Sequence, residues 1–148
     1  MYEFVDRHPR HLGNPGRLLL WALRGWNQSM ASKACPPLAL YRGFCRVGAS
    51  AALNDFHVAS TLMRREGLKP LHVAPMDACR IEEDEAILLA LWQGVAREDV
   101  DQVSGTLKLL VKPDAILAVA RAMADCSNQM MRAGLDLSRA TALSENLQ

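Results

Sequence analysis

Proline and glycine residues divide this chain into segments whose apolar residues recur with helical spacing. Boundaries of this kind fall at Pro15, Gly67, Pro113 and Gly134. Proline suits the first turn of a helix but not its interior, and glycine accepts the left-handed turn that often ends one. No run of alternating apolar and polar residues is long enough to build a sheet. The pattern therefore predicts an all-α fold, a compact single-domain bundle of five or six helices.

Each expected helix has its own apolar pattern. The first begins at Asn14-Pro15, and residues 38–66 are expected to be helical again, with a break or bend near Gly43 and Gly48. Residues 68–80 form the longest expected internal loop. The third helix opens on the acidic run 82–85, where carboxylates favour the positive helix terminus, and its body is apolar nearly all round. We therefore expect it at the centre of the core, with two further helices starting near Glu98-Asp99 and at Pro113.

Length and composition agree with a bundle that needs no cross-links. The chain has 148 residues, of which 50% are hydrophobic and only 5% aromatic. A chain of this length buries enough surface to fold without a metal or disulfide. We expect a flexible N-terminal arm over 1–14, a helical domain over 15–134 and a loosely ordered tail over 135–148.

The charge is balanced overall but uneven along the chain. The net charge is +1, yet residues 1–66 contain nine Lys and Arg against four Asp and Glu, and residues 67–148 contain eight against twelve. Such asymmetry either orients the protein toward a partner or is neutralised within the molecule. The N-terminal sequence lacks the long apolar run of a signal peptide, and no segment is long enough to span a bilayer. We therefore expect a soluble cytoplasmic protein.

Four cysteines and the histidines are the candidate metal ligands. Metal sites usually contain close ligand pairs, and Cys35 and Cys45 are ten residues apart. His72 and Cys79 share one loop, so folding would have to unite these four residues into a site. The alternative is that each cysteine is a small buried or loop residue. We expect no cofactor.

No catalytic constellation is evident. Cys79 lies near His72 in sequence, but no nucleophile elbow or cysteine-protease signature surrounds it. The acidic run 82–85 lacks the alternating ligands and glycine of a calcium loop, and helix capping explains it. We therefore do not expect an enzyme.

The first helix carries the candidate partner-binding residues, Trp21, Arg24 and Trp26. Tryptophan and arginine are common anchors at protein interfaces, although the same residues suit core packing. We favour a small non-catalytic protein–protein interaction or regulatory module, with a homodimer as one form of it. A metal- or redox-sensing protein using Cys35, Cys45 and Cys79 is the second hypothesis. A nucleic-acid-binding regulator acting through the basic first half is the third, although no recognition helix rich in exposed basic residues is apparent.

Overall fold

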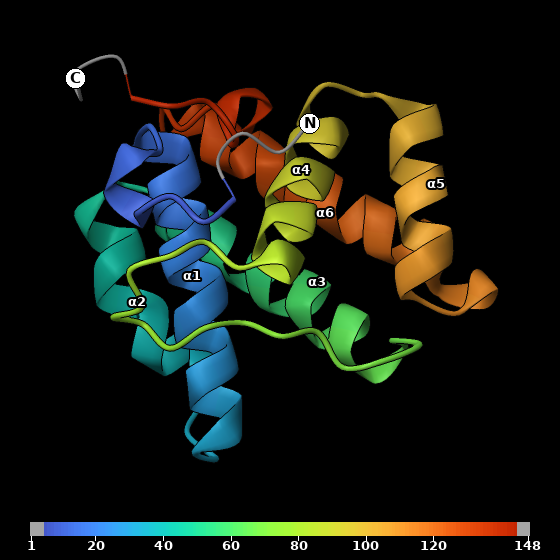
Figure 1. Ribbon diagram of the computed structural model, residues 1–148, viewed down its shortest axis with the longest axis horizontal. Coiled ribbons are helices and arrows are strands. Elements are labelled where there is room, and N and C mark those ends of the chain that lie inside the picture. Colours follow the sequence, from blue (N-terminus) through green and yellow to red (C-terminus); the bar gives the residue numbers. More distant parts are fainter. Residues whose placement is uncertain (1–4, 145–148) are drawn as a thin grey trace.

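The computed structural model describes residues 5–144, and within them it contains six α-helices and no strand. Short 3₁₀ turns lie before α1 and α3, before α6 and near the C-terminal end. The helices pack around one hydrophobic core (Figure 1). The prediction of an all-α bundle is confirmed. The helices are α1 (Asn14–Ala31), α2 (Pro36–Arg46), α3 (Leu53–Arg65), α4 (Glu83–Ala96), α5 (Val100–Leu110) and α6 (Ile116–Arg132).

The helix boundaries follow the proline and glycine positions. Pro15 and Pro36 lie in the first turns of α1 and α2, and Pro113 opens the 3₁₀ turn that leads into α6. The expected break in residues 38–66 occurs at Gly48, which has a φ of +75° and lies in the turn after α2. Gly43 does not break the helix. It lies inside α2, where the Trp21 ring packs so close to its backbone that a β-carbon would collide.

Helix α4 lies at the centre of the core, as its uniformly apolar sequence predicts. Its buried residues include Leu89, Leu91 and Trp92. Aromatic contacts connect it to the neighbouring helices: Trp92 stacks on Phe56 of α3 with ring centroids 5.8 Å apart, and Phe56 lies 5.8 Å from Phe44 of α2. Such contacts add to the burial of apolar area and fix how the helices pack.

The described parts of the predicted arm and tail pack on each other and on the bundle. Leu12 is fully buried, the Gly13 N–H donates to the Ala142 carbonyl at 2.9 Å, and the Gln93 side chain of α4 accepts two hydrogen bonds from Thr141. Figure 1 shows the C-terminal segment beside the start of α1. The outer parts of the predicted arm and tail, residues 1–4 and 145–148, lie outside the described residues.

Within residues 5–144, no helix combines the length and the apolar character needed to cross a bilayer.

The packing of α1 on the C-terminal segment predicts a large difference between two glycine substitutions. A β-carbon at Gly16 would collide with the Ala140 carbonyl, whereas one at Gly105 in α5 would meet open space. We expect Gly16→Ala to lower the free energy of unfolding by about 1–3 kcal/mol through overpacking. Gly105→Ala should raise it by up to about 1 kcal/mol through helix propensity. Urea unfolding of both variants tests this, and equal effects would contradict the packing described.

Candidate functional site

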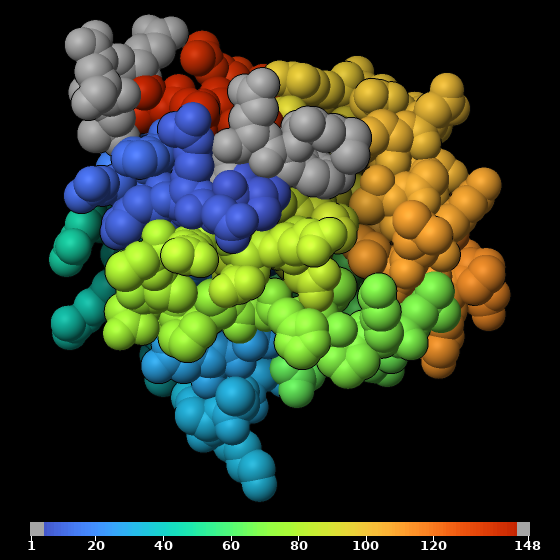
Figure 2. Space-filling view, in the orientation of Figure 1, coloured from blue at the N-terminus to red at the C-terminus, as the bar shows by residue number. Residues whose placement is uncertain are grey.

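The segment between α3 and α4 crosses the outside of the bundle. We call residues 67–82 the strap. It passes in front of α1 in Figure 1, and its yellow-green atoms cover the middle of this face in Figure 2. Within it, residues 70–75 are neither helix nor turn. Main-chain hydrogen bonds tie its two ends, Leu68 to Leu110 of α5 and Ile81 to Asp6 and Arg7. Because the strap between these ends contains little regular structure, its position there depends on contacts with α1 and α4.

A buried ion pair supplies those contacts. The Arg24 side chain of α1 is 2% exposed and that of Glu85 in α4 is fully buried. The Arg24 guanidinium donates to both Glu85 carboxylate oxygens, at 2.7 and 2.9 Å. It also donates to the main-chain carbonyls of Ala78 and Arg80 in the strap, at 3.0 and 2.9 Å. The bidentate pair therefore joins two helices and fixes the strap with the donors that remain.

Carboxylates at the start of α4 hold the strap from the other side. The Glu85 carboxylate accepts from the Ala74 N–H at 3.1 Å and from the Glu82 N–H at 2.8 Å, which also completes a capping box. Asp84 accepts from the His72 N–H at 2.8 Å. The acidic run therefore caps the helix, as predicted, and in addition positions the strap.

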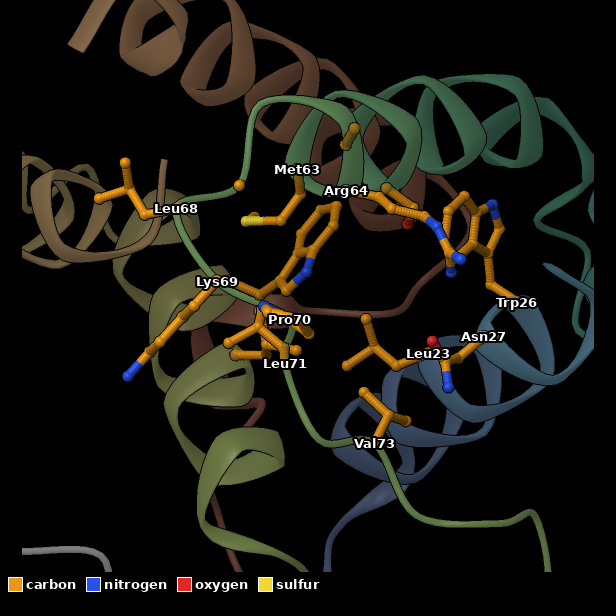
Figure 3. Close-up of a pocket in the computed structure, with 15 residues that line it drawn as sticks. Leu23, Trp26, Asn27, Met63, Arg64, Leu68, Lys69, Pro70, Leu71 and Val73 are labelled. Atoms are coloured by element: carbon orange, nitrogen blue, oxygen red, sulfur yellow. The ribbon is translucent and has the colours of Figure 1, made fainter. Parts of the chain in front are cut away.

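The strap, α1, α3 and α4 enclose a pocket of about 460 Å³ (Figure 3). This volume lies within the range of small-ligand sites. The walls are mainly apolar, and the side chains that form them include Leu23, Trp26, Met63, Leu71, Leu88 and Trp92. Asn27 and Ser60 contribute polar groups.

One wall of the pocket is fixed by a hydrogen bond between side chains. The Trp26 indole N–H donates to Nδ1 of His57 in α3 at 3.0 Å. The two rings are tilted, with centroids 6.2 Å apart. Because the indole is 6% exposed and its polar atom is paired, its remaining surface presents an apolar face to the pocket.

The charged residues of the pocket lining are both cationic. Arg64 and Lys69 are exposed, and neither side chain forms a hydrogen bond or ion pair within residues 5–144. In the view of Figure 3, Arg64 extends toward Trp26 and Lys69 extends away from the pocket. An apolar space with cations at its rim suits a ligand that combines an apolar group with a negative charge.

The three predicted partner-binding residues occupy different environments. Trp21 is partly buried and packs on α2, with its ring 6.3 Å from that of Phe44. Arg24 is buried in the ion pair, so it is not available on the surface. Trp26 is buried among the helices, and one face of its ring lines the pocket. Of the three residues, Trp26 therefore lines the pocket beneath the strap.

The predicted metal ligands are not brought together. Cys35, Cys45 and Cys79 are exposed free thiols. Across residues 5–144 no group of three or more His, Cys, Asp or Glu side chains is placed to hold a metal, and that includes His72. The thiol of Cys45 raises the pKa of Tyr41 through a hydrogen bond and charge interaction.

A second, more open hollow lies between α3 and α6 and has the opposite charge. Asp55, Asp114 and Asp125 line it together with Arg121 and the exposed Leu117. Partial burial, and then the nearby Asp125, raise the pKa of Asp55. Two faces of α3 therefore border hollows of different character, one apolar with a cationic rim and one acidic.

Comparison with protein-family models, with curated proteins and with solved structures finds no match to this chain.

The Arg24–Glu85 pair predicts a non-additive mutational response. Arg24→Met leaves a buried carboxylate without its cation, and Glu85→Leu leaves a buried guanidinium without its anion. We expect each single substitution to lower the free energy of unfolding by about 3–5 kcal/mol. The double variant Arg24→Met/Glu85→Leu should lose clearly less than the sum, because no buried charge remains. Additive losses in urea unfolding would show that the two side chains act separately.

The cysteines are expected to differ sharply in reactivity. Burial, and then the nearby Asp55, raise the pKa of Cys126 to about 12. The thiolate is the reactive form, so Cys126 should resist alkylation at pH 8. Mass spectrometry after iodoacetamide treatment should find three labels on the native protein, at Cys35, Cys45 and Cys79. A fourth should appear only in denaturant, and native labelling of Cys126 would contradict its burial.

Proposed function

We propose that the protein is a non-catalytic protein–protein interaction module with a regulatory role. It binds a partner by accepting an apolar side chain of that partner in the pocket beneath the strap. The observation that supports this most directly is the pocket itself, about 460 Å³ in volume and mainly apolar. Interfaces derive most of their affinity from a few large side chains inserted into such desolvated spaces.

The walls of the pocket favour binding without large rearrangement. Trp26 is held by His57, and Trp92 is held by its stack on Phe56. The strap is fixed by Arg24 and Glu85. Preformed walls lower the entropic cost of association, since few side chains must be ordered on binding.

Of the three predicted partner-binding residues, Trp26 takes part in this function, but not as an anchor that enters the partner. Trp26 contributes a wall of the receiving pocket rather than a projecting anchor.

A cytoplasmic location belongs to the same proposal and is supported by the exposed free thiols, which suit a reducing compartment. A second copy of this chain is one candidate partner. The metal- or redox-sensing and nucleic-acid-binding hypotheses stay predictions.

Filling the pocket provides the test. Ser60 lies in α3 and lines the pocket, so Ser60→Trp should occupy it without removing a core side chain. Asn54→Trp is the matched control, because Asn54 is exposed on the same helix and outside the pocket. Peptides selected from a random phage-displayed library against the unmodified protein should bind Ser60→Trp at least 10-fold more weakly. They should bind Asn54→Trp as they bind the unmodified protein.

Two results would contradict this function. Selected peptides that bind both tryptophan variants equally would place the interaction elsewhere on the surface. A library that yields no binder, together with a small apolar molecule retained by the purified protein and lost in Ser60→Trp, would make the pocket a small-molecule site. Circular dichroism must show both variants helical for either result to count.

A further inference from the structure

We propose that the partner segment is an extended acidic peptide that pairs with the main chain of Leu71 and Val73 as an added strand. Its central apolar side chain enters the pocket, and its carboxylates face Arg64 and Lys69. This inference rests on the proposed function and specifies the chemistry and conformation of the partner.

The hydrogen bonds of the strap show that it is extended at this point. The N–H groups of His72 and Ala74 both point to carboxylates of α4, at 2.8 and 3.1 Å. Alternate residues of an extended chain direct their main-chain groups to the same side, and the intervening residues direct theirs to the other. The main-chain groups of Leu71 and Val73 therefore face away from the α4 carboxylates.

Those groups are unpaired. Within residues 5–144 neither the N–H nor the C=O of Leu71 or Val73 takes part in a hydrogen bond. Unpaired donors and acceptors along an extended segment form a template for strand addition. The carboxylates of α4 occupy one side of the strap, and the main-chain groups on its other side have no partner among the described residues.

Side-chain geometry connects this edge to the pocket. Leu71 and Val73 both line it. A strand paired beside them projects every second side chain to the same side as theirs. One large apolar side chain then points into the pocket, and the residues two positions before and after it lie over the rim.

The positive charge at the rim of the pocket favours acidic residues on either side of the peptide's apolar anchor. The charged side chains lining the pocket are Arg64 and Lys69, and both lack an ionic partner among the described residues. Carboxylates two positions either side of the anchor complement these cations and oppose binding of a basic segment.

The test uses a fluorescein-labelled heptapeptide, Ser-Asp-Thr-Phe-Thr-Asp-Ser, and fluorescence anisotropy with the full-length protein. We expect saturable binding that weakens at least 10-fold when Phe is replaced by Ala or both Asp by Lys. The variant Arg64→Glu/Lys69→Glu should prefer the lysine-containing peptide. Lys108→Glu/Arg132→Glu is the matched control, since both residues are exposed, lie outside the pocket and give the same charge change.

Main-chain pairing is tested on the peptide, so the fold of the protein is not altered. One peptide is N-methylated at Phe and another at both Thr. In a paired strand the N–H of Phe and the N–H groups of the two Thr point to opposite sides, and only one side faces the strap. One methylated peptide should therefore bind like the parent, and the other at least 10-fold more weakly. Equal behaviour of the two, absence of binding by the parent at 1 mM, or indifference to Arg64→Glu/Lys69→Glu would overturn the inference. If library peptides still bind in a Ser60→Trp-sensitive manner, the proposed function stands without it.

Discussion

Between its two ends, the strap is held mainly by the groups of one buried ion pair. Arg24 and Glu85 are 61 residues apart in sequence, and their bidentate contact joins α1 to α4. The same two side chains also bind the strap. The Arg24 guanidinium donates to the Ala78 and Arg80 carbonyls, and the Glu85 carboxylate accepts from the Ala74 N–H. Burial of two charges is costly, and these extra hydrogen bonds are what make the arrangement tolerable. The pocket exists because the strap is held at this distance from the helices.

The two hollows that border α3 differ in charge. The cations of the first half and the carboxylates of the second meet only at Arg24–Glu85 as an ion pair within residues 5–144. The other charged groups remain on the surface, so the pocket has a cationic rim while the hollow between α3 and α6 is acidic. This difference does not follow the two halves of the sequence, because Lys69 belongs to the acidic half and Asp55 to the basic half.

Sequence patterns predicted the helices well because helix formation depends on local spacing. The break at Gly48, the start of α4 after its acidic run and the central position of α4 all follow from residues close in sequence. The candidate site was less predictable. Arg24 resembles a surface residue in the helical pattern, since nothing local indicates that Glu85 lies against it. The pocket joins residues from Leu23 to Trp92, and no spacing rule connects them. Arg24 shares its side of the first helix with Arg17 and Gln28, so the helical pattern contains no signal for a buried partner.

The aromatic residues of the pocket have a practical consequence. The chain has three tryptophans, and two of them, Trp26 and Trp92, line the pocket, whereas Trp21 packs on α2. Indole emission shifts with the polarity of its surroundings, so displacement of water from the pocket should alter the intrinsic fluorescence of the unlabelled protein. Tryptophan fluorescence therefore reports whether the pocket is filled, and Trp21, which lies away from the pocket, serves as an internal reference.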